Sequence, residues 1–120
     1  MRIKLEISYI KVSGRTIRFN NTLKFRVVPD PIVRGNLYIE DNFFYIHETA
    51  PTFAQLVDQV RDALAIQYEG IALQNDSNLS DSSIALKKYF ISNLKEKEYR
   101  YVNHVTFKYK KNNSINKGVK

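Results

Sequence analysis

Basic side chains gather in two stretches of the chain, and in the second, residues 99–111, they are interleaved with aromatic residues. Cations neutralise phosphates and rings stack on bases, so the combination is typical of nucleic-acid binding. An acidic protein surface is an alternative partner, and a solvated basic edge that resists aggregation is the alternative without one. The candidate contacts are Arg15, Arg18, Lys24, Arg26, Arg100, His104, Lys108, Lys110 and Lys111.

Groups that could catalyse a reaction are few. The chain has no cysteine, which removes thiolate nucleophiles and cysteine-based metal sites, and its histidines are His47 and His104. His47 precedes Glu48, but adjacent strand residues point to opposite faces and form no joint site. Asp58 and Asp62 are four residues apart, as expected for the solvent side of a helix. We therefore expect no catalytic residue, no metal and no cofactor.

Charge follows the sequence in blocks. The chain carries 19 Lys and Arg against 12 Asp and Glu, a formal net charge of +7. Residues 1–39 and 87–120 are basic, whereas residues 40–86 are acidic, with Arg61 as their one strong base. If the fold keeps these blocks on separate surfaces, the resulting field steers a charged partner.

The chain before residue 30 is expected to form strands. Residues 3–9 alternate between apolar and polar types up to a turn at Ser13-Gly14. The side chains expected to face the core are Ile3, Leu5, Ile7 and Tyr9.

A hairpin is predicted next, between residues 16–19 and 23–27. A three-residue loop, Asn20-Asn21-Thr22, keeps the apolar residues of both arms on one face. The same register places Arg18 directly opposite Lys24 on the outward face, and such a like-charged pair suggests an anionic partner.

A second hairpin is predicted after the prolines of residues 28–31 end the preceding strand. Its arms are residues 37–40 and 43–46, joined by the two-residue loop Asp41-Asn42. Both faces of this hairpin carry apolar residues. It is therefore either a central pair covered on both sides or a carrier of an exposed aromatic patch of Tyr38, Phe43 and Tyr45.

A helix is predicted from Thr52 to about Gly70, because Thr52 and Gln55 have the spacing of a capping box. Its apolar stripe consists of Phe53, Leu56, Val57, Val60, Leu64 and Tyr68. A second helix starts after a cap at Ser80 or Asp81. Its apolar side consists of Ile84, Lys87 or Lys88, Ile91 and Leu94, widened by Tyr89 and Phe90.

The expected architecture is α+β, with a mostly antiparallel sheet of five or six strands and two helices, at least one packed on a face of the sheet. Residues 99–109 alternate and supply the last strand. We expect one globular domain over 1–109 and a flexible basic tail over 110–120. No apolar run is long enough to cross a membrane, so a cytoplasmic location is expected.

Residues 52–70, TFAQLVDQVRDALAIQYEG, resemble the helix of HicB-like antitoxins. In that family a Thr-capped helix follows a strand, carries acidic or amide residues on its outer side, and closes with an Ala-Leu pair and a Glu. Val28-Pro29-Asp30-Pro31 is similar to the family's Pro-Asp turn. The resemblance implies a small sheet with a helix packed on it, similar to ribonuclease H without its catalytic carboxylates, and docking on a toxin that attacks RNA.

If such docking occurs, the acidic block is its expected place, with contacts to a basic partner from Glu40, Asp41, Glu48, Asp58 and Asp62. The predicted function is a HicB-like, non-enzymatic inhibitor that occludes a nucleic-acid-acting protein. One alternative is a small inhibitor from a mobile element such as a phage, directed at a bacterial nuclease defence, for example an anti-CRISPR or antirestriction protein. The other alternative is a basic protein that binds nucleic acid directly. The protein could also form a homodimer.

Overall fold

The computed structural model describes residues 3–95, which form an antiparallel sheet with the strand order β1-β2-β3-β4 and two α-helices. The elements are β1 (Ile3–Val12), β2 (Arg15–Pro29), β3 (Leu37–Asp41), β4 (Ile46–Ala50), α1 (Phe53–Gln67), the π-helical turn η1 (Tyr68–Ala72), the 3-10 turn η2 (Asp76–Asn78) and α2 (Asp81–Ser92). This confirms the α+β class. Four strands replace the expected five or six in this part of the chain, and the strand predicted at 99–109 and the tail at 110–120 lie outside the described residues.

The first hairpin closes at Ser13-Gly14, as predicted. Both residues have positive φ values, 52° and 77°, which suit a tight two-residue turn between twisted strands. The hairpin predicted at residues 20–22 is wrong, because β2 continues through that segment and pairs with β1 on both sides of it, at residues 15–18 and 23–27. The chain has already reversed at Ser13-Gly14, so residues 23–27 find their partners on β1.

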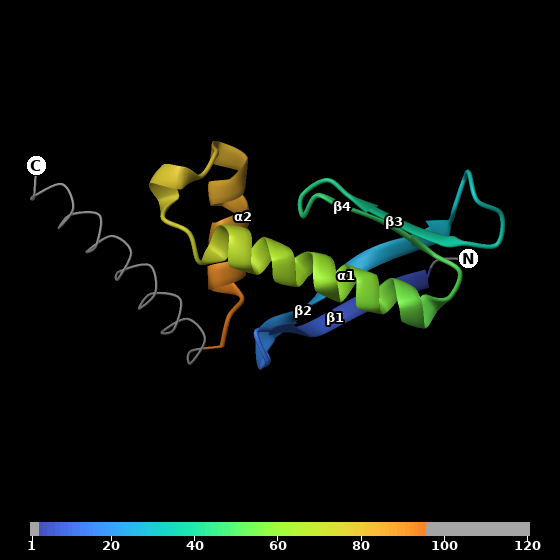
Figure 1. The fold of residues 1–120 in the computed structure, drawn as a ribbon, viewed down its shortest axis with the longest axis horizontal. Coiled ribbons are helices and arrows are strands. Elements are labelled where there is room, and N and C mark those ends of the chain that lie inside the picture. Colours follow the sequence, from blue (N-terminus) through green and yellow to red (C-terminus); the bar gives the residue numbers. More distant parts are fainter. Residues whose placement is uncertain (1–2, 96–120) are drawn as a thin grey trace, which may run out of the picture.

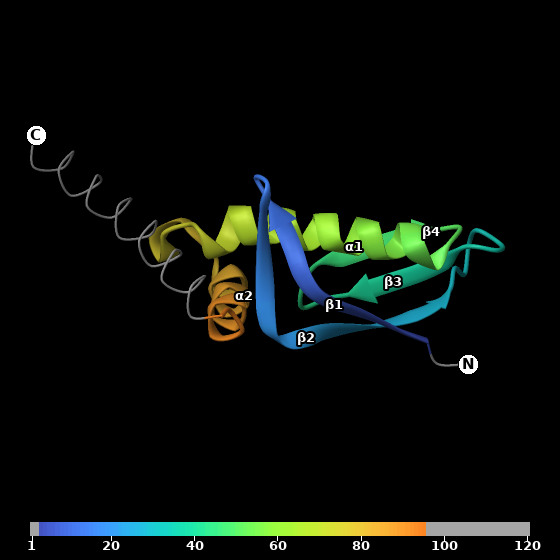
Figure 2. The same ribbon diagram turned by 90° about the horizontal axis from the view of Figure 1, so that it is seen from below.

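β2 turns a corner at residues 19–22. These four residues stand between the pairs Ile7–Leu23 and Tyr9–Arg18 and face only Ser8 on β1. The irregularity shifts the alternation of β1, so Tyr9 is half-buried and faces outward, contrary to its predicted inward position. Figure 2 shows β2 bending sharply beneath the rest of the fold.

The end of α2 holds this corner in place. Asn93 is buried, and its side chain accepts from the Asn21 N–H at 2.7 Å and donates to the Asn21 carbonyl at 2.8 Å. The Asn20 N–H donates to the Asn93 carbonyl at 2.7 Å, and Phe19 bridges to Leu94. The bulged residues thus exchange hydrogen bonds with α2 that they cannot make with β1.

The β3–β4 hairpin follows Pro29, which ends β2 as predicted. Its register differs from the prediction, because β4 begins at Ile46 and pairs with Asp41, leaving residues 42–45 as the loop. The register differs because Phe44 is buried in the core, where its ring centroid lies 5.5 Å from that of Phe25. Asp41 Oδ1 accepts from the Phe44 N–H at 2.9 Å and closes the longer loop.

α1 begins as predicted, with the Thr52 hydroxyl accepting from the Gln55 N–H at 3.2 Å. It lies against β1 and β4, the two edges of the curled sheet (Figure 1). The buried stripe is Leu56, Val60, Leu64 and Tyr68. Phe53, predicted to belong to it, is instead 42% exposed at the first turn, and the chain passes Gly70 in η1 after α1 has ended at Gln67.

α2 is capped by Ser80, whose hydroxyl accepts from the Ser83 N–H at 3.3 Å. Of the two candidate lysines, Lys87 is on the buried side and Lys88 is exposed. The Lys87 ammonium donates to Asp76 Oδ1 at 2.8 Å and to the Gln74 carbonyl, which ties α2 to the segment before it.

Candidate nucleic-acid interface

The outward side of β1 and β2 carries a set of exposed cations. The inward side chains of both strands, such as Leu5 and Phe25, are buried in the core, so their neighbours along each strand point outward. We call this outward surface the cationic face. Its exposed basic residues are Lys4, Lys11, Arg18, Lys24 and Arg26.

The pairing register of β1 and β2 brings other charged residues opposite each other than the sequence predicted. Arg18 is opposite Tyr9 and Lys24 is opposite Glu6, so the predicted opposition of Arg18 and Lys24 is wrong. The like-charged pair is instead Lys4 and Arg26. Two cations directly opposite each other on neighbouring strands disfavour the fold slightly, and an anion between them would remove that cost.

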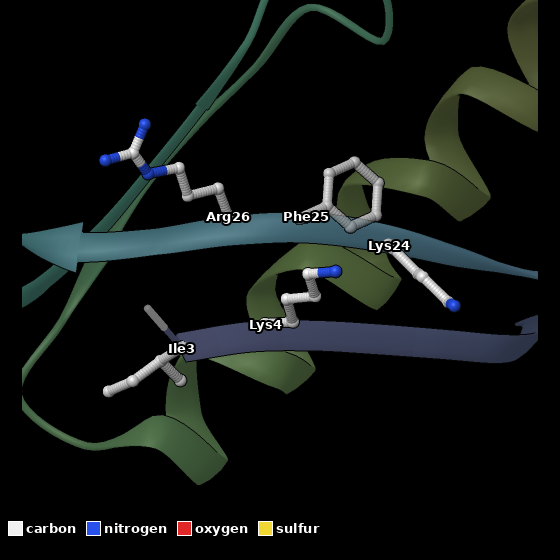
Figure 3. A pocket seen from close by; sticks show the side chains of 5 residues that line it. All are labelled: Ile3, Lys4, Lys24, Phe25 and Arg26. Carbon is white, nitrogen blue, oxygen red and sulfur yellow. The ribbon is translucent and has the colours of Figure 1, made fainter. Parts of the chain in front are cut away.

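A hollow of about 380 Å³ lies on this face, lined by Ile3, Lys4, Lys24, Phe25 and Arg26. In Figure 3, Lys4 reaches from β1 towards β2 and Lys24 reaches back towards β1, while Arg26 points away from β1 on the far side of β2. Within residues 3–95, no carboxylate ion-pairs with these three cations. Glu6 is opposite Lys24 on the neighbouring strand, whereas Lys4 and Arg26 are opposite each other, so the three cations outnumber the nearby carboxylate.

Sequence reasoning missed Lys4 and Lys11. It placed Arg18, Lys24 and Arg26 outward correctly but paired the two halves of β2 with each other. The Ser13-Gly14 turn could have revealed the position of Lys4. It makes β1 the partner of β2 and so brings Lys4 next to Arg26.

The other predicted basic contacts do not extend this face. Arg15 is half-buried next to the turn, opposite Val12. The remaining five, Arg100, His104, Lys108, Lys110 and Lys111, lie outside the described residues.

Tyr9 is the one aromatic ring among the outward residues of β1 and β2; Phe25 also lines the hollow but is buried. The guanidinium carbon of Arg61, from α1, lies 4.3 Å from the Tyr9 ring centroid, and that of Arg18 lies 5.9 Å from it. Cation–π contacts thus already occupy this ring.

The predicted acidic contacts are dispersed over the fold. Glu40 is exposed on the outer side of the β3–β4 hairpin, whereas Asp41 is used to close the hairpin loop. Asp58 and Asp62 are exposed on α1, and Asp58 pairs with Arg61 at 3.4 Å. These carboxylates do not form one continuous site.

Glu48 faces α1 from β4. The Gln59 amide donates to Glu48 Oε2 at 3.3 Å and to the Thr49 carbonyl at 2.9 Å when its nitrogen is placed to satisfy both groups. Burial, followed by the charge of Asp62, raises the pKa of Glu48, while His47 opposes this shift.

A cluster that the sequence did not reveal lies on the outer side of the hairpin. The Tyr38 hydroxyl is 3.1 Å from Glu40 Oε2 and 3.4 Å from His47 Nδ1, and Glu40 Oε1 is 3.9 Å from His47 Nδ1. Desolvation, followed by Glu40, raises the pKa of Tyr38. The four-residue loop creates this cluster by placing Glu40 opposite His47. With the two-residue loop expected from the sequence, Glu40 and His47 would not be opposite each other.

A second hollow, of about 280 Å³, lies beside this cluster, between the hairpin and the loop after β2. Asp30 lines it and accepts hydrogen bonds from the Thr49 hydroxyl and from the N–H groups of Ile32 and Val33. These bonds lower the pKa of Asp30, with Thr49 contributing most. Ile32 projects beside the carboxylate and is almost fully exposed.

The aromatic residues of the hairpin are only partly covered. Phe43 is 46% and Tyr45 is 55% exposed, and the Phe43 ring packs edge-to-face on Phe44 and on Tyr89 at 5.1 and 5.4 Å. Of the two alternatives for this hairpin, the exposed aromatic surface fits Phe43 and Tyr45, whereas Tyr38 is half-buried.

Residues 3–95 contain no group of three side chains placed to hold a metal ion. None of the helices in that range combines the length and the apolar character needed to span a bilayer. Comparisons with protein-family models, with curated proteins and with solved structures gave no match. The resemblance to HicB-like antitoxins therefore stays a prediction, and the function has to be argued from the surfaces of this chain.

Proposed function

We propose that this chain is a non-enzymatic binding protein whose cationic face binds the phosphate backbone of nucleic acid. The observation that carries the proposal is that Lys4, Lys24 and Arg26 all line one hollow, with no carboxylate ion-paired to them within residues 3–95. Lys11 and Arg18 extend the same outward surface. Each cation that meets a phosphate releases counterions, which is the main source of sequence-independent affinity.

A phosphate backbone fits this face better than a protein surface does. Specific protein interfaces have an apolar core within a polar rim. The large apolar side chains exposed in residues 3–95 all belong to other elements: Ile32, Val33, Phe43, Tyr45, Phe53, Ile66 and Tyr89. On the cationic face the exposed large side chains are charged, while the apolar residues of its hollow, Ile3 and Phe25, are half-buried and buried, so the face suits a ligand that offers charge.

A binding function also accords with the exposure of the reactive groups. Enzymes bring several reactive groups together in an enclosed site. The His47 and Glu40 side chains are 59% and 49% exposed, on the open side of a hairpin. Solvent there screens the electrostatic interactions that could make these two side chains more reactive.

An inhibitor that docks on a nucleic-acid-acting protein is the second candidate, in the HicB-like form or as a mobile-element inhibitor of a nuclease defence. It is favoured by a different surface, the outer side of the β3–β4 hairpin and the loop after β2. There the exposed apolar residues Ile32 and Val33 lie beside Asp30, and the carboxylate of Glu40 is on the same hairpin. This combination suits a basic protein surface.

The first proposal is tested by binding of a fluorescently labelled DNA duplex to the full chain. The variant K4Q/K24Q/R26Q removes three charges around the hollow. At about 0.1 M salt we expect roughly 1000-fold weaker binding, because each of the three lost phosphate contacts removes about one tenfold step.

The matched control is R34Q/K88Q/K95Q, which removes the same charge from exposed positions away from the hollow. We expect it to bind within about threefold of the natural sequence, since distant surface charges are screened. Circular dichroism verifies that both variants stay folded. Equal losses in the two variants, or no binding of the natural sequence at low salt, would refute the proposal.

A further inference from the structure

The cationic face offers no free aromatic ring for stacking on a base. Among its outward residues, Tyr9 is the one aromatic side chain, and it is half-buried. The Arg61 guanidinium lies 4.3 Å from its ring centroid, and Arg18 approaches the same ring at 5.9 Å. A nucleotide base would have to displace these cations to reach the ring.

The lack of a free ring distinguishes between single-stranded and double-stranded nucleic acid, because the two present different groups to a protein. Proteins that hold single strands combine a basic groove with aromatic rings on which successive bases stack. A duplex hides the faces of its bases and presents two rows of phosphates at high charge density. A face of cations without stacking rings matches the duplex.

We infer that the ligand of the cationic face is double-stranded nucleic acid, held through its phosphates without recognition of base sequence. The inference rests on the proposed function and specifies its ligand. Lys4 and Lys24 reach across the two strands from opposite sides, while Arg26 points away from β1, so the three cations spread over the width of the hairpin (Figure 3). Such a spread suits contacts to several phosphates.

The dimensions of the hairpin are compatible with this ligand. Lys24 and Arg26 are two residues apart on one strand, which separates their α-carbons by about 7 Å. β1 has ten residues, a length of about 33 Å. That length corresponds to about ten base pairs at the 3.4 Å rise of a duplex.

The side chains of this face that could read bases are Arg18 and Arg26, and Arg18 already approaches the Tyr9 ring. Base recognition relies on paired contacts from Arg, Asn or Gln to base edges in the grooves. Near the hollow, Glu6 is opposite Lys24, and Ser8 is the next outward residue of β1. A carboxylate there repels phosphate, so contacts are expected from the surrounding cations.

The test compares a labelled duplex of about 20 base pairs, twice the span of β1, with each of its separated strands, by fluorescence anisotropy in the same buffer. A DNA duplex and an RNA duplex of the same sequence are both used, as is a DNA duplex of scrambled sequence. We expect the duplexes to bind at least about tenfold more tightly than their strands. The scrambled duplex should bind equally well.

Single strands that bind as tightly as the duplex would overturn this inference and leave the proposed function standing. A strong preference for one sequence would also overturn it. Failure of every nucleic acid to bind would refute the proposed function itself. K4Q/K24Q/R26Q should abolish the difference between duplex and strand, whereas R34Q/K88Q/K95Q should preserve it.

Discussion

Replacing Asn93 with alanine tests whether α2 holds the corner of β2. The substitution removes two hydrogen bonds between the Asn93 side chain and the backbone of Asn21, at 2.7 and 2.8 Å. Each such bond stabilises a fold by about 1 kcal/mol, and an Asn21 group left dry and unpaired costs about 1–3 kcal/mol. We therefore expect a loss of about 2–4 kcal/mol in the free energy of unfolding.

Urea unfolding followed by circular dichroism measures this loss, with an unchanged dependence on denaturant if the transition stays two-state. Asn20→Ala removes the single side-chain bond to the Leu94 carbonyl, at 2.8 Å, and should cost about 1 kcal/mol. Asn42→Ala, at an exposed loop position, serves as the control and should change stability by less than about 0.5 kcal/mol. If Asn93→Ala behaves like Asn42→Ala, the corner does not depend on α2.

Three further substitutions test other parts of the fold. Lys87→Met keeps the buried stem but removes the contacts with Asp76 and the Gln74 carbonyl, and should lower the unfolding free energy by about 1–3 kcal/mol in urea titrations. Thr52→Ala should cost about 1 kcal/mol, seen as a lower melting temperature, because α1 loses its cap. Glu48→Gln should raise the urea midpoint at neutral pH. Because burial raises the pKa of Glu48, its charge costs stability above the folded-state pKa, and the advantage of Gln should vanish as pH falls below the unfolded-state pKa. An advantage that grows towards acid would contradict this assignment.

Local signals were sufficient for the elements that depend on neighbouring residues. The Thr52 cap on the Gln55 N–H, the Ser13-Gly14 turn and the proline that ends β2 are all present where the sequence predicted them. Each is a short-range effect of side-chain hydrogen bonds or restricted backbone angles.

The corner of β2 could not be predicted from neighbouring residues. Asn20-Asn21-Thr22 has the composition of a hairpin loop, and the group that stabilises it as a corner, Asn93, is more than seventy residues away. In the β3–β4 hairpin, burial of Phe44 lengthens the loop and changes the register. Tertiary packing thus decided both elements.

The candidate site was predictable in part. Period-two alternation placed Arg18, Lys24 and Arg26 on the outward face, as the structure has them. Lys4 was missed because its place in the hollow depends on pairing between β1 and β2. The cluster of Tyr38, Glu40 and His47 was missed because one register error moves every side-chain pair of a hairpin.

The salt dependence of duplex binding tests the central claim most directly. The logarithm of the association constant is measured against the logarithm of the salt concentration, between about 50 and 200 mM, where each phosphate contact contributes a slope of about −0.9. We predict that K4Q/K24Q/R26Q makes the slope shallower by about 2.7, while R34Q/K88Q/K95Q keeps the slope of the natural sequence. The same slope in all three proteins, or a flat plot for the natural sequence, would contradict phosphate binding by the cationic face.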